Sequence, residues 1–307
     1  SCESEGMTHT DTVLVVGEAL IDIVERDGTD AEHVGGSPAN VAVGIARQGV
    51  SATLLTRLGR DDRGRRIADQ VTASGAAIDA ASWTDAATST ARARLRADGS
   101  ADYEFDIVWA LDAAAAEAAA EAASVVHSGS IALFLQPGGE VALATLERAR
   151  EAGRIVTVDP NVRPALVGDD PRPVAERAFA AASLVKLSDE DAEALYPGMS
   201  AEQVLEIIAA FGPQVVVMTR GGEGALALGA AGTVEVAPLS VDVADTIGAG
   251  DAFMASLITS LVDDAALLAG DVDALQRALR RAVVTAGITV SRPGANPPTR
   301  TEVDAAL

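Results

Sequence analysis

The chain has 307 residues, of which 49% are apolar and 3% aromatic, and its formal net charge is −22. This length and composition suit one large α/β domain with an appendage, in which Ala, Val, Leu and Ile build the core. The negative charge argues against a nucleic acid or an anionic membrane surface as partner, because both need a basic surface. The single cysteine, Cys2, cannot form an internal disulfide, so we expect a cytoplasmic protein.

Strands and helices alternate along most of the chain, which predicts a mostly parallel sheet with helices on both faces. We take residues 1–10 as a tail or added residues and residues 11–307 as one domain. Ser37 fits the N-cap of the first helix, Pro38 its first residue and Gly49 its end. No apolar run approaches the ~20 residues that a membrane span needs. The expected strands are 13–16, 21–24, 52–56, 124–128, 155–159, 184–187 and 214–219. The expected helices are 38–48, 62–74, 113–123, 139–152, 173–182, 201–211, one ending at 261, and 272–290.

Two hairpins interrupt this alternation. Segments 90–95 and 102–107 flank Asp98-Gly99, a strong signal for a tight turn between antiparallel strands. Together with the strand around Asp22, this hairpin is expected to form a small separate sheet. A second hairpin joins 225–228 to 233–236.

The stretch Asp245-Thr246-Ile247-Gly248-Ala249-Gly250-Asp251 leads directly into an apolar helical pattern. Unpaired N–H groups and the dipole at a helix N-terminus make an anion site. A carboxylate would repel a phosphate bound there. The placement is explained if Asp251 is a base that takes the proton from a hydroxyl attacking this phosphate. The alternative is an ordinary helix start with acidic residues near glycine.

Other nucleotide and catalytic motifs are absent from the sequence. It contains no P-loop, no Gly-x-Gly-x-x-Gly and no Gly-x-Ser-x-Gly, and its histidines and single cysteine are too dispersed for a zinc site. In an open α/β sheet, ligands bind at the carboxyl ends of the strands, where Asp159, Thr219 and the 245–251 loop are expected. Lys186 is the only lysine of the chain. Either this position requires a compact ammonium group, or the lysine is there by chance.

Taken together, these stretches resemble the ribokinase/PfkB family of sugar kinases. The two signature regions of that family resemble 35–49 and 245–257, and five intermediate motifs match in order. These motifs are Gly17-Glu18…Asp22, Gly59-Arg60-Asp61-Asp62-Arg63-Gly64, Asp159-Pro160-Asn161-Val162-Arg163 with Lys186-Leu187-Ser188-Asp189-Glu190-Asp191, and Thr219-Arg220-Gly221-Gly222-Glu223-Gly224. The resemblance implies a ribokinase-like doubly wound fold with a small β-sheet lid at about 18–35 and 88–110.

The resemblance also implies roles for individual residues. Asp251 would be the base, and Gly248, Ala249 and Gly250 the anion hole. The sugar would be held by Asp22, Gly35, Gly36, Asn40, Asp159, Asn161 and Arg163. ATP would be held by Lys186, Ser188, Thr219, Arg220, Gly221, Gly222 and Gly224. Asp191 would reach Mg²⁺ through water, and backbone oxygens near Asp245 and Ile247 would hold K⁺.

Within the family the details are similar to those of the fructokinases, namely Gly-Gly-x-Pro-Ala-Asn at 35–40, Asp-x-Asn-x-Arg at 159–163 and Lys-x-Ser at 186–188. We therefore expect an ATP- and Mg²⁺-dependent kinase that phosphorylates a primary hydroxyl of a free sugar, with fructose favoured. A 2-keto-3-deoxygluconate kinase, a ribokinase, a nucleoside kinase and a non-catalytic sugar or nucleotide sensor are the alternatives. Fructokinases and 2-keto-3-deoxygluconate kinases commonly have an arginine after the second lid strand, where this chain has Ile107-Val108-Trp109. The apolar residues within 103–111 predict a homodimer through the lid.

Overall fold

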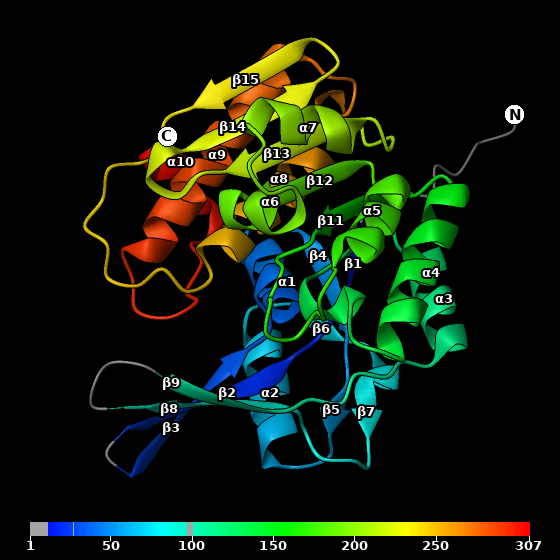
Figure 1. Cartoon of the computed structure of the whole chain (residues 1–307), viewed down its shortest axis with the longest axis vertical. Helices are drawn as coiled ribbons and strands as arrows, with labels where there is room; N and C mark the ends of the chain where they lie inside the picture. Colours follow the sequence, from blue (N-terminus) through cyan, green and yellow to red (C-terminus); the bar gives the residue numbers. More distant parts are fainter. Residues whose placement is uncertain (1–11, 27, 97–100) are drawn as a thin grey trace, which may run out of the picture.

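A nine-stranded sheet forms the centre of the protein in the computed structural model, which describes residues 12–26, 28–96 and 101–307 (Figure 1). The strand order is β15-β14-β13-β12-β11-β10-β1-β4-β6. All neighbours from β6 to β13 are parallel, and β14 and β15 add an antiparallel edge. The strands are β1 (Thr12–Val16), β4 (Ser51–Leu55), β6 (Ala77–Ile78), β10 (Val125–Gly129), β11 (Ile155–Asp159), β12 (Leu184–Ser188), β13 (Val215–Thr219), β14 (Ala225–Gly229) and β15 (Gly232–Val236).

Helices cover both faces of this sheet, because the side chains of each buried strand alternate between two apolar cores. Val13 and Val15 pack into the core under α1, α8 and α9, whereas Leu14 and Val16 pack into the core under α3, α4, α5 and α7. The helices are α1 (Ser37–Arg47), α2 (Asp62–Ala73), α3 (Ala113–Glu121), α4 (Gly138–Glu151), α5 (Arg172–Ala181), α6 (Asp189–Leu195), α7 (Ala201–Ala209), α8 (Ala249–Asp263), α9 (Val272–Val290) and α10 (Arg300–Ala306). The described residues include no helix that is both long and apolar enough to cross a membrane.

A smaller sheet lies apart from the large one, at the bottom of Figure 1. Its order is β3-β2-β8-β9, from β2 (Leu20–Arg26), β3 (Thr29–Gly35), β8 (Thr90–Leu95) and β9 (Ala101–Asp106). Asp22 points away from the buried side chains of Ile21 and Ile23, as the alternation predicts. The predicted turn at Asp98-Gly99 and the tail at 1–10 lie outside the described residues.

The structure confirms the doubly wound α/β class and the small sheet, and it adds elements that the pattern did not predict. These are β3, β6, α6, α10, a two-stranded ladder of β5 (Leu58–Gly59) with β7 (Trp83–Thr84), and short 3-10 turns at Ala80–Ser82, Ser130–Leu133, Gly221–Glu223 and Ala265–Leu267. The prediction of Ser37 as an N-cap is wrong. Gly36 occupies that position with a φ of 106°, and Ser37 is the first helical residue.

Candidate active site

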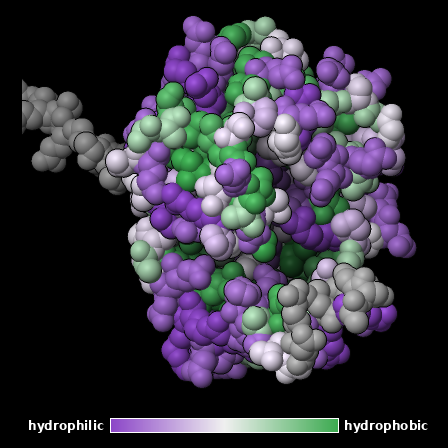
Figure 2. All heavy atoms as spheres, turned by 90° about the vertical axis from the view of Figure 1, so that its left-hand side faces the viewer, coloured by the Kyte–Doolittle hydropathy of each residue, from purple (hydrophilic) through white to green (hydrophobic). Residues whose placement is uncertain are grey.

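A cavity of about 1730 Å³ lies between the two sheets. Figure 2 shows the molecule hollowed between its upper and lower parts. One wall comes from β2 and β3, and the other from the N-termini of α1 and α8, the loop after β11 and the segment after α9. The loops that follow the carboxyl ends of β10 and β11 therefore open to the cavity, as expected for an open α/β sheet.

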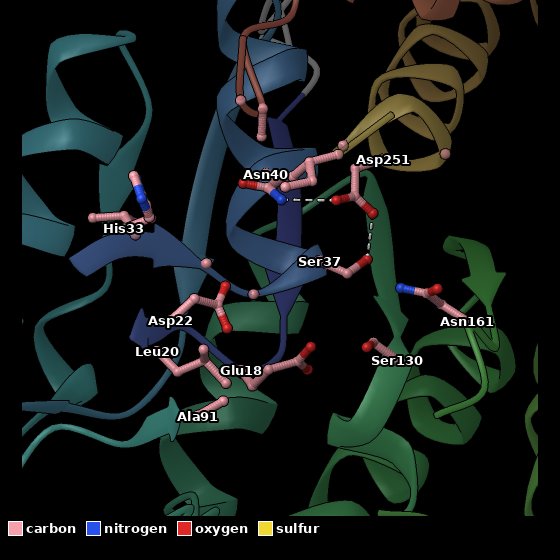
Figure 3. Close-up of a pocket in the computed structure, with 18 of the residues that line it drawn as sticks. Glu18, Leu20, Asp22, His33, Ser37, Asn40, Ala91, Ser130, Asn161 and Asp251 are labelled. Atoms are coloured by element: carbon pink, nitrogen blue, oxygen red, sulfur yellow. Dashed lines mark hydrogen bonds between the residues drawn. The ribbon is translucent and has the colours of Figure 1, made fainter. Parts of the chain in front are cut away.

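Asp251 lies in the first turn of α8 with both carboxylate oxygens held by α1 (Figure 3). Oδ1 accepts a hydrogen bond of 2.6 Å from the Ser37 hydroxyl, and Oδ2 accepts one of 2.8 Å from the Asn40 amide. Asp251 is 9% exposed and lines the cavity. Its carboxylate is thus fixed in orientation and remains accessible from the cavity.

The start of α8 offers backbone donors to the same cavity. Gly248 is its N-cap with a φ of 75°, and no side chain among the described residues caps the helix. A Cβ at Gly248 would come within 2.7 Å of the Ala295 side chain, so this position needs glycine for space as well as for conformation. Gly248, Ala249 and Gly250 all line the cavity. Backbone N–H groups at a helix start without a side-chain cap fit an anion.

The predicted sugar residues mostly face this cavity. Asp22, Gly35, Gly36, Asn40, Asn161 and Arg163 all line it. Gly35 leaves room for the Asp22 carboxylate, because a Cβ there would lie 2.0 Å from Asp22 Oδ2. Loss of water around Asp22 raises its pKa, and the positive charges of His33 and Arg163 counteract this. Asn161 has a φ of 37°, a conformation uncommon outside glycine, which turns the chain sharply after β11.

Asp159 departs from this pattern because it lies below the cavity floor. It is 1% exposed and is not among the lining residues, and its Oδ2 accepts a hydrogen bond of 2.8 Å from Lys186 Nζ. Burial raises the pKa of Asp159 to about 6, whereas the nearby ammonium lowers it. Asp159 is therefore not placed to contact a sugar in the cavity directly. Lys186 itself reaches the cavity wall.

Ser188 and Asp191 form a capping box at the start of α6. Asp191 Oδ2 accepts from the N–H and the hydroxyl of Ser188, and Oδ1 accepts from the N–H of Val162 at 2.7 Å. Both oxygens of this buried carboxylate are thus engaged by protein donors, and neither residue lines the large cavity. The proposed water-mediated Mg²⁺ contact of Asp191 stays a prediction.

The predicted ATP loop after β13 also lies outside the large cavity. Thr219 ends β13, Gly221 and Gly222 are in the 3-10 turn, and Arg220 forms an ion pair with Glu235. A Cβ at Gly224 would lie 2.1 Å from the Val236 carbonyl, so this glycine lets the two β14–β15 ends meet. Their contact with ATP stays a prediction.

Asp245 and Ile247 lie on the cavity wall just before α8. Asp245 accepts hydrogen bonds from the N–H groups of Ile247 at 3.0 Å and Gly294 at 2.9 Å, and these bonds lower its pKa. The carboxylate thereby joins the loop before α8 to the segment after α9.

Glu18 and Ser130 are among the polar residues on the cavity wall that sequence reasoning did not assign to the site (Figure 3). Glu18 is 5% exposed, accepts a hydrogen bond of 3.1 Å from the Ala132 N–H, and has a pKa raised to about 8 by burial. Ser130 has a φ of 56° in the turn that follows β10. The only sequence signal for Glu18 was its place in the Gly17-Glu18 motif after β1.

Comparison with known proteins agrees with this geometry. Residues 10–302 match the pfkB family of carbohydrate kinases. A fructokinase from Rhizobium leguminosarum bv. trifolii is 32% identical over 289 residues, covering 87% of this chain and 85% of that relative.

Solved structures agree as well. The crystal structure of a fructokinase from Xylella fastidiosa with bound ATP has a TM-score of 0.87 at 28% identity, over 96% of this chain and 98% of the other. A double mutant of a Vibrio cholerae fructokinase in a form bound to fructose, ADP and potassium has a TM-score of 0.83 at 26% identity, over 96% and 98% of the two chains.

The fold and the site define an enzyme that transfers a group to a small polar acceptor. The chain belongs to the pfkB family of carbohydrate kinases.

Proposed function

We propose that this kinase transfers the γ-phosphoryl group of ATP to a primary hydroxyl of fructose. The observation that carries the proposal is the carboxylate of Asp251, held at both oxygens beside the uncapped start of α8. A sugar hydroxyl placed at Asp251 gives up its proton to the carboxylate as its oxygen attacks the γ-phosphorus, and the bond from that phosphorus to the bridging oxygen breaks so that ADP leaves. The N–H groups of α8 stabilise the negative charge on the transferring group. The names of the similar fructokinases support fructose as the acceptor.

The small sheet serves as the lid of this site in our proposal. Asp22 on β2 faces the cavity opposite Asp251, so the sugar is held between the two sheets (Figure 3). Closing the sheet over the substrate excludes water, which would otherwise compete with the sugar for the phosphoryl group.

Mg²⁺ and K⁺ are the metal ions that this reaction needs in our proposal. The described residues contain no cluster of three or more acidic, histidine or cysteine side chains that could hold a metal. Mg²⁺ often binds through phosphates and water with few protein ligands, which fits such a site. When bound, it neutralises phosphate charge. Backbone oxygens near Asp245 and Ile247 are the candidates for K⁺, and replacing K⁺ by Na⁺ in the assay tests this.

The measurement is coupled ADP release with Mg-ATP and a panel of fructose, ribose, tagatose, 2-keto-3-deoxygluconate and adenosine. We expect fructose to be the strongest acceptor. Asp251→Asn should lower kcat by about 10²–10⁴-fold with little change in sugar binding, because it removes the base and keeps the shape. Asp263→Asn, at the exposed far end of the same helix, is the matched control and should retain full activity.

Three outcomes would contradict parts of the proposal. Turnover of Asp251→Asn equal to that of the unchanged enzyme would remove Asp251 from its role as base. A stronger acceptor than fructose would keep the kinase and replace the sugar. Thermal stabilisation by sugar or ATP without ADP release would favour a sensor.

We also propose that the lid mediates a homodimer. Tyr103 and Phe105 on β9 stack with ring centroids 6.1 Å apart and are 66% and 37% exposed, and Val108 is 51% exposed. Trp109, predicted as part of the same surface, is instead buried and donates to the Ala132 carbonyl at 2.8 Å. Sedimentation velocity should show a dimer for the unchanged chain and a monomer for Tyr103→Ser/Phe105→Ser.

A further inference from the structure

The sheet face under α8 turns from apolar to polar towards the cavity. Val125 on β10 and Leu184 on β12 belong to the apolar core that packs against α8. Two residues further along each strand, on the same face, lie His127 and Lys186. Lys186 forms its ion pair with Asp159 there, with side chains 4% and 1% exposed. A buried ion pair is often no more stabilising than apolar residues of similar volume, so stability alone does not explain it.

The Lys186 ammonium lies directly behind the start of α8. A Cβ placed on Gly250 would be 3.1 Å from Lys186 Nζ. Lys186 also lines the cavity together with Gly248, Ala249 and Asp251. Asp159 Oδ2 holds the ammonium at 2.8 Å from the side away from the cavity. The position therefore combines a fixed cation, a glycine that makes room for it, and a helix start that offers N–H donors.

We propose that Lys186 supplies the fixed positive charge of the anion hole and that Asp159 is the residue that positions it. This inference rests on the kinase activity proposed above. A helix N-terminus contributes the equivalent of roughly half an elementary charge, whereas an ammonium contributes a full one. In a site shielded from water, such a charge stabilises the negative phosphoryl group without any rearrangement during transfer. The role also explains why the only lysine of the chain lies here and not an arginine, since the planar guanidinium is larger.

The decisive variant is the double substitution Lys186→Met/Asp159→Asn. Lys186→Met alone leaves a buried carboxylate without its partner and is expected to destabilise the fold. The double variant removes both charges and keeps similar volumes, so it should fold. We expect its kcat to fall by about 10²–10³-fold, as for the loss of one donor of an oxyanion hole, with KM for the sugar within about threefold of the unchanged enzyme. Lys186→Arg/Asp159→Asn is the comparison that returns a cation, and it should recover part of kcat.

A binding measurement makes the test independent of the sugar. Aluminium tetrafluoride imitates the transferring phosphoryl group, and calorimetry without sugar gives the gain in ADP affinity that it produces. We expect this gain in the unchanged enzyme and its loss in the double variant, with binding of a non-hydrolysable ATP analogue little changed. Thr157→Val, on the same buried face next to Asp159, is the uncharged control and should keep the gain.

Opposite results overturn the inference. If the double variant folds and retains kcat within about threefold, or retains the aluminium fluoride gain, the pair is only structural. Failure to phosphorylate fructose would reject the proposed acceptor, while the aluminium fluoride comparison would still decide the role of Lys186.

Discussion

Glu18 is a buried carboxyl group that the mechanism above does not use. Its side chain lies on the cavity wall near Ser130, and burial raises its pKa to about 8, so the folded protein holds it protonated at neutral pH. In the unfolded chain the same group ionises near the ordinary glutamate pKa of 4.5. Between these two values the folded state binds the additional proton, so this group makes folding less favourable as the pH rises.

Glu18→Gln isolates this effect because the amide keeps the shape without the ionisation. We expect the unchanged protein to lose stability relative to Glu18→Gln by a few kcal/mol as the pH rises from about 5 to about 9. Urea unfolding of both proteins at each pH measures the difference between their free energies of unfolding. The contributions of the other carboxylates are shared by both proteins and cancel in this difference. A constant difference across this range would show that Glu18 is ionised in the folded state.

The site residues show what a local sequence pattern can predict and what it cannot. The role of Asp251 followed from small residues before a carboxylate at a helix start. Its hydrogen bonds to Ser37 and Asn40 join residues 214 and 211 positions apart, which no local pattern states. Asp191 was interpreted through the resemblance as a metal contact, although Ser188-x-x-Asp191 also matches the spacing of a capping box, which is what the structure contains.

At the scale of elements, β3 is tied to α2 by charges. Glu32 on β3 accepts hydrogen bonds from Arg63 at 3.1 Å and from Arg66 at 2.5 Å, and both arginines belong to α2. The hydrogen bond from Arg63 is the main reason that the pKa of Glu32 is lowered. This cluster joins the small sheet to the large domain beside the cavity.

Removing the charge of Glu32 should weaken that junction. We expect Glu32→Gln to lower the free energy of unfolding by about 1 kcal/mol at low salt, and by less in about 1 M NaCl, because these groups are partly exposed and screened. Glu104→Gln, in an exposed pair with Arg94 inside the small sheet, is the control and should have a smaller effect. Equal losses at both salt concentrations would mean that shape and not charge holds β3 against α2.

The elements predicted correctly were those with a clear hydrophobic pattern or a clear turn signal in the sequence. Strands buried on both faces, such as β1 and β13, read as continuous apolar runs, and the hairpin of β8 and β9 was marked by its turn. The strand β3 was missed because its sequence TDAEHVG is mostly polar, and it is fixed by pairing along β2. The short helix α10 was missed because its seven residues carry little apolar period, although its capping box at Thr299 and Glu302 is visible in the sequence.

At the scale of the whole molecule, the cavity exists because two sheets from one chain face each other. The resemblance predicted both sheets, and most of the residues that it assigned to the sugar and the anion hole line the cavity. It did not predict that Asp159 is below the floor, since a strand-end residue can point to either face of a sheet. That outcome depends on the register that sets Lys186 beside Asp159 across β12 and β11, which only the assembled sheet defines.

The charge of the whole molecule should affect its two substrates differently. The net charge of −22 repels anions at a distance, and Mg-ATP is an anion whereas fructose is neutral. Raising the ionic strength from about 20 to about 300 mM shortens the Debye length from about 20 to about 6 Å, which screens this long-range repulsion, so it should raise kcat/KM for Mg-ATP several-fold. The value for fructose should stay constant, which makes the sugar an internal control for effects of salt on the fold. The salt is varied with tetramethylammonium chloride at fixed Mg²⁺ and K⁺, so that neither ion is itself changed. A fall of kcat/KM for Mg-ATP with salt would show that local cations such as Lys186 and Arg163 outweigh the net charge along the path of the nucleotide.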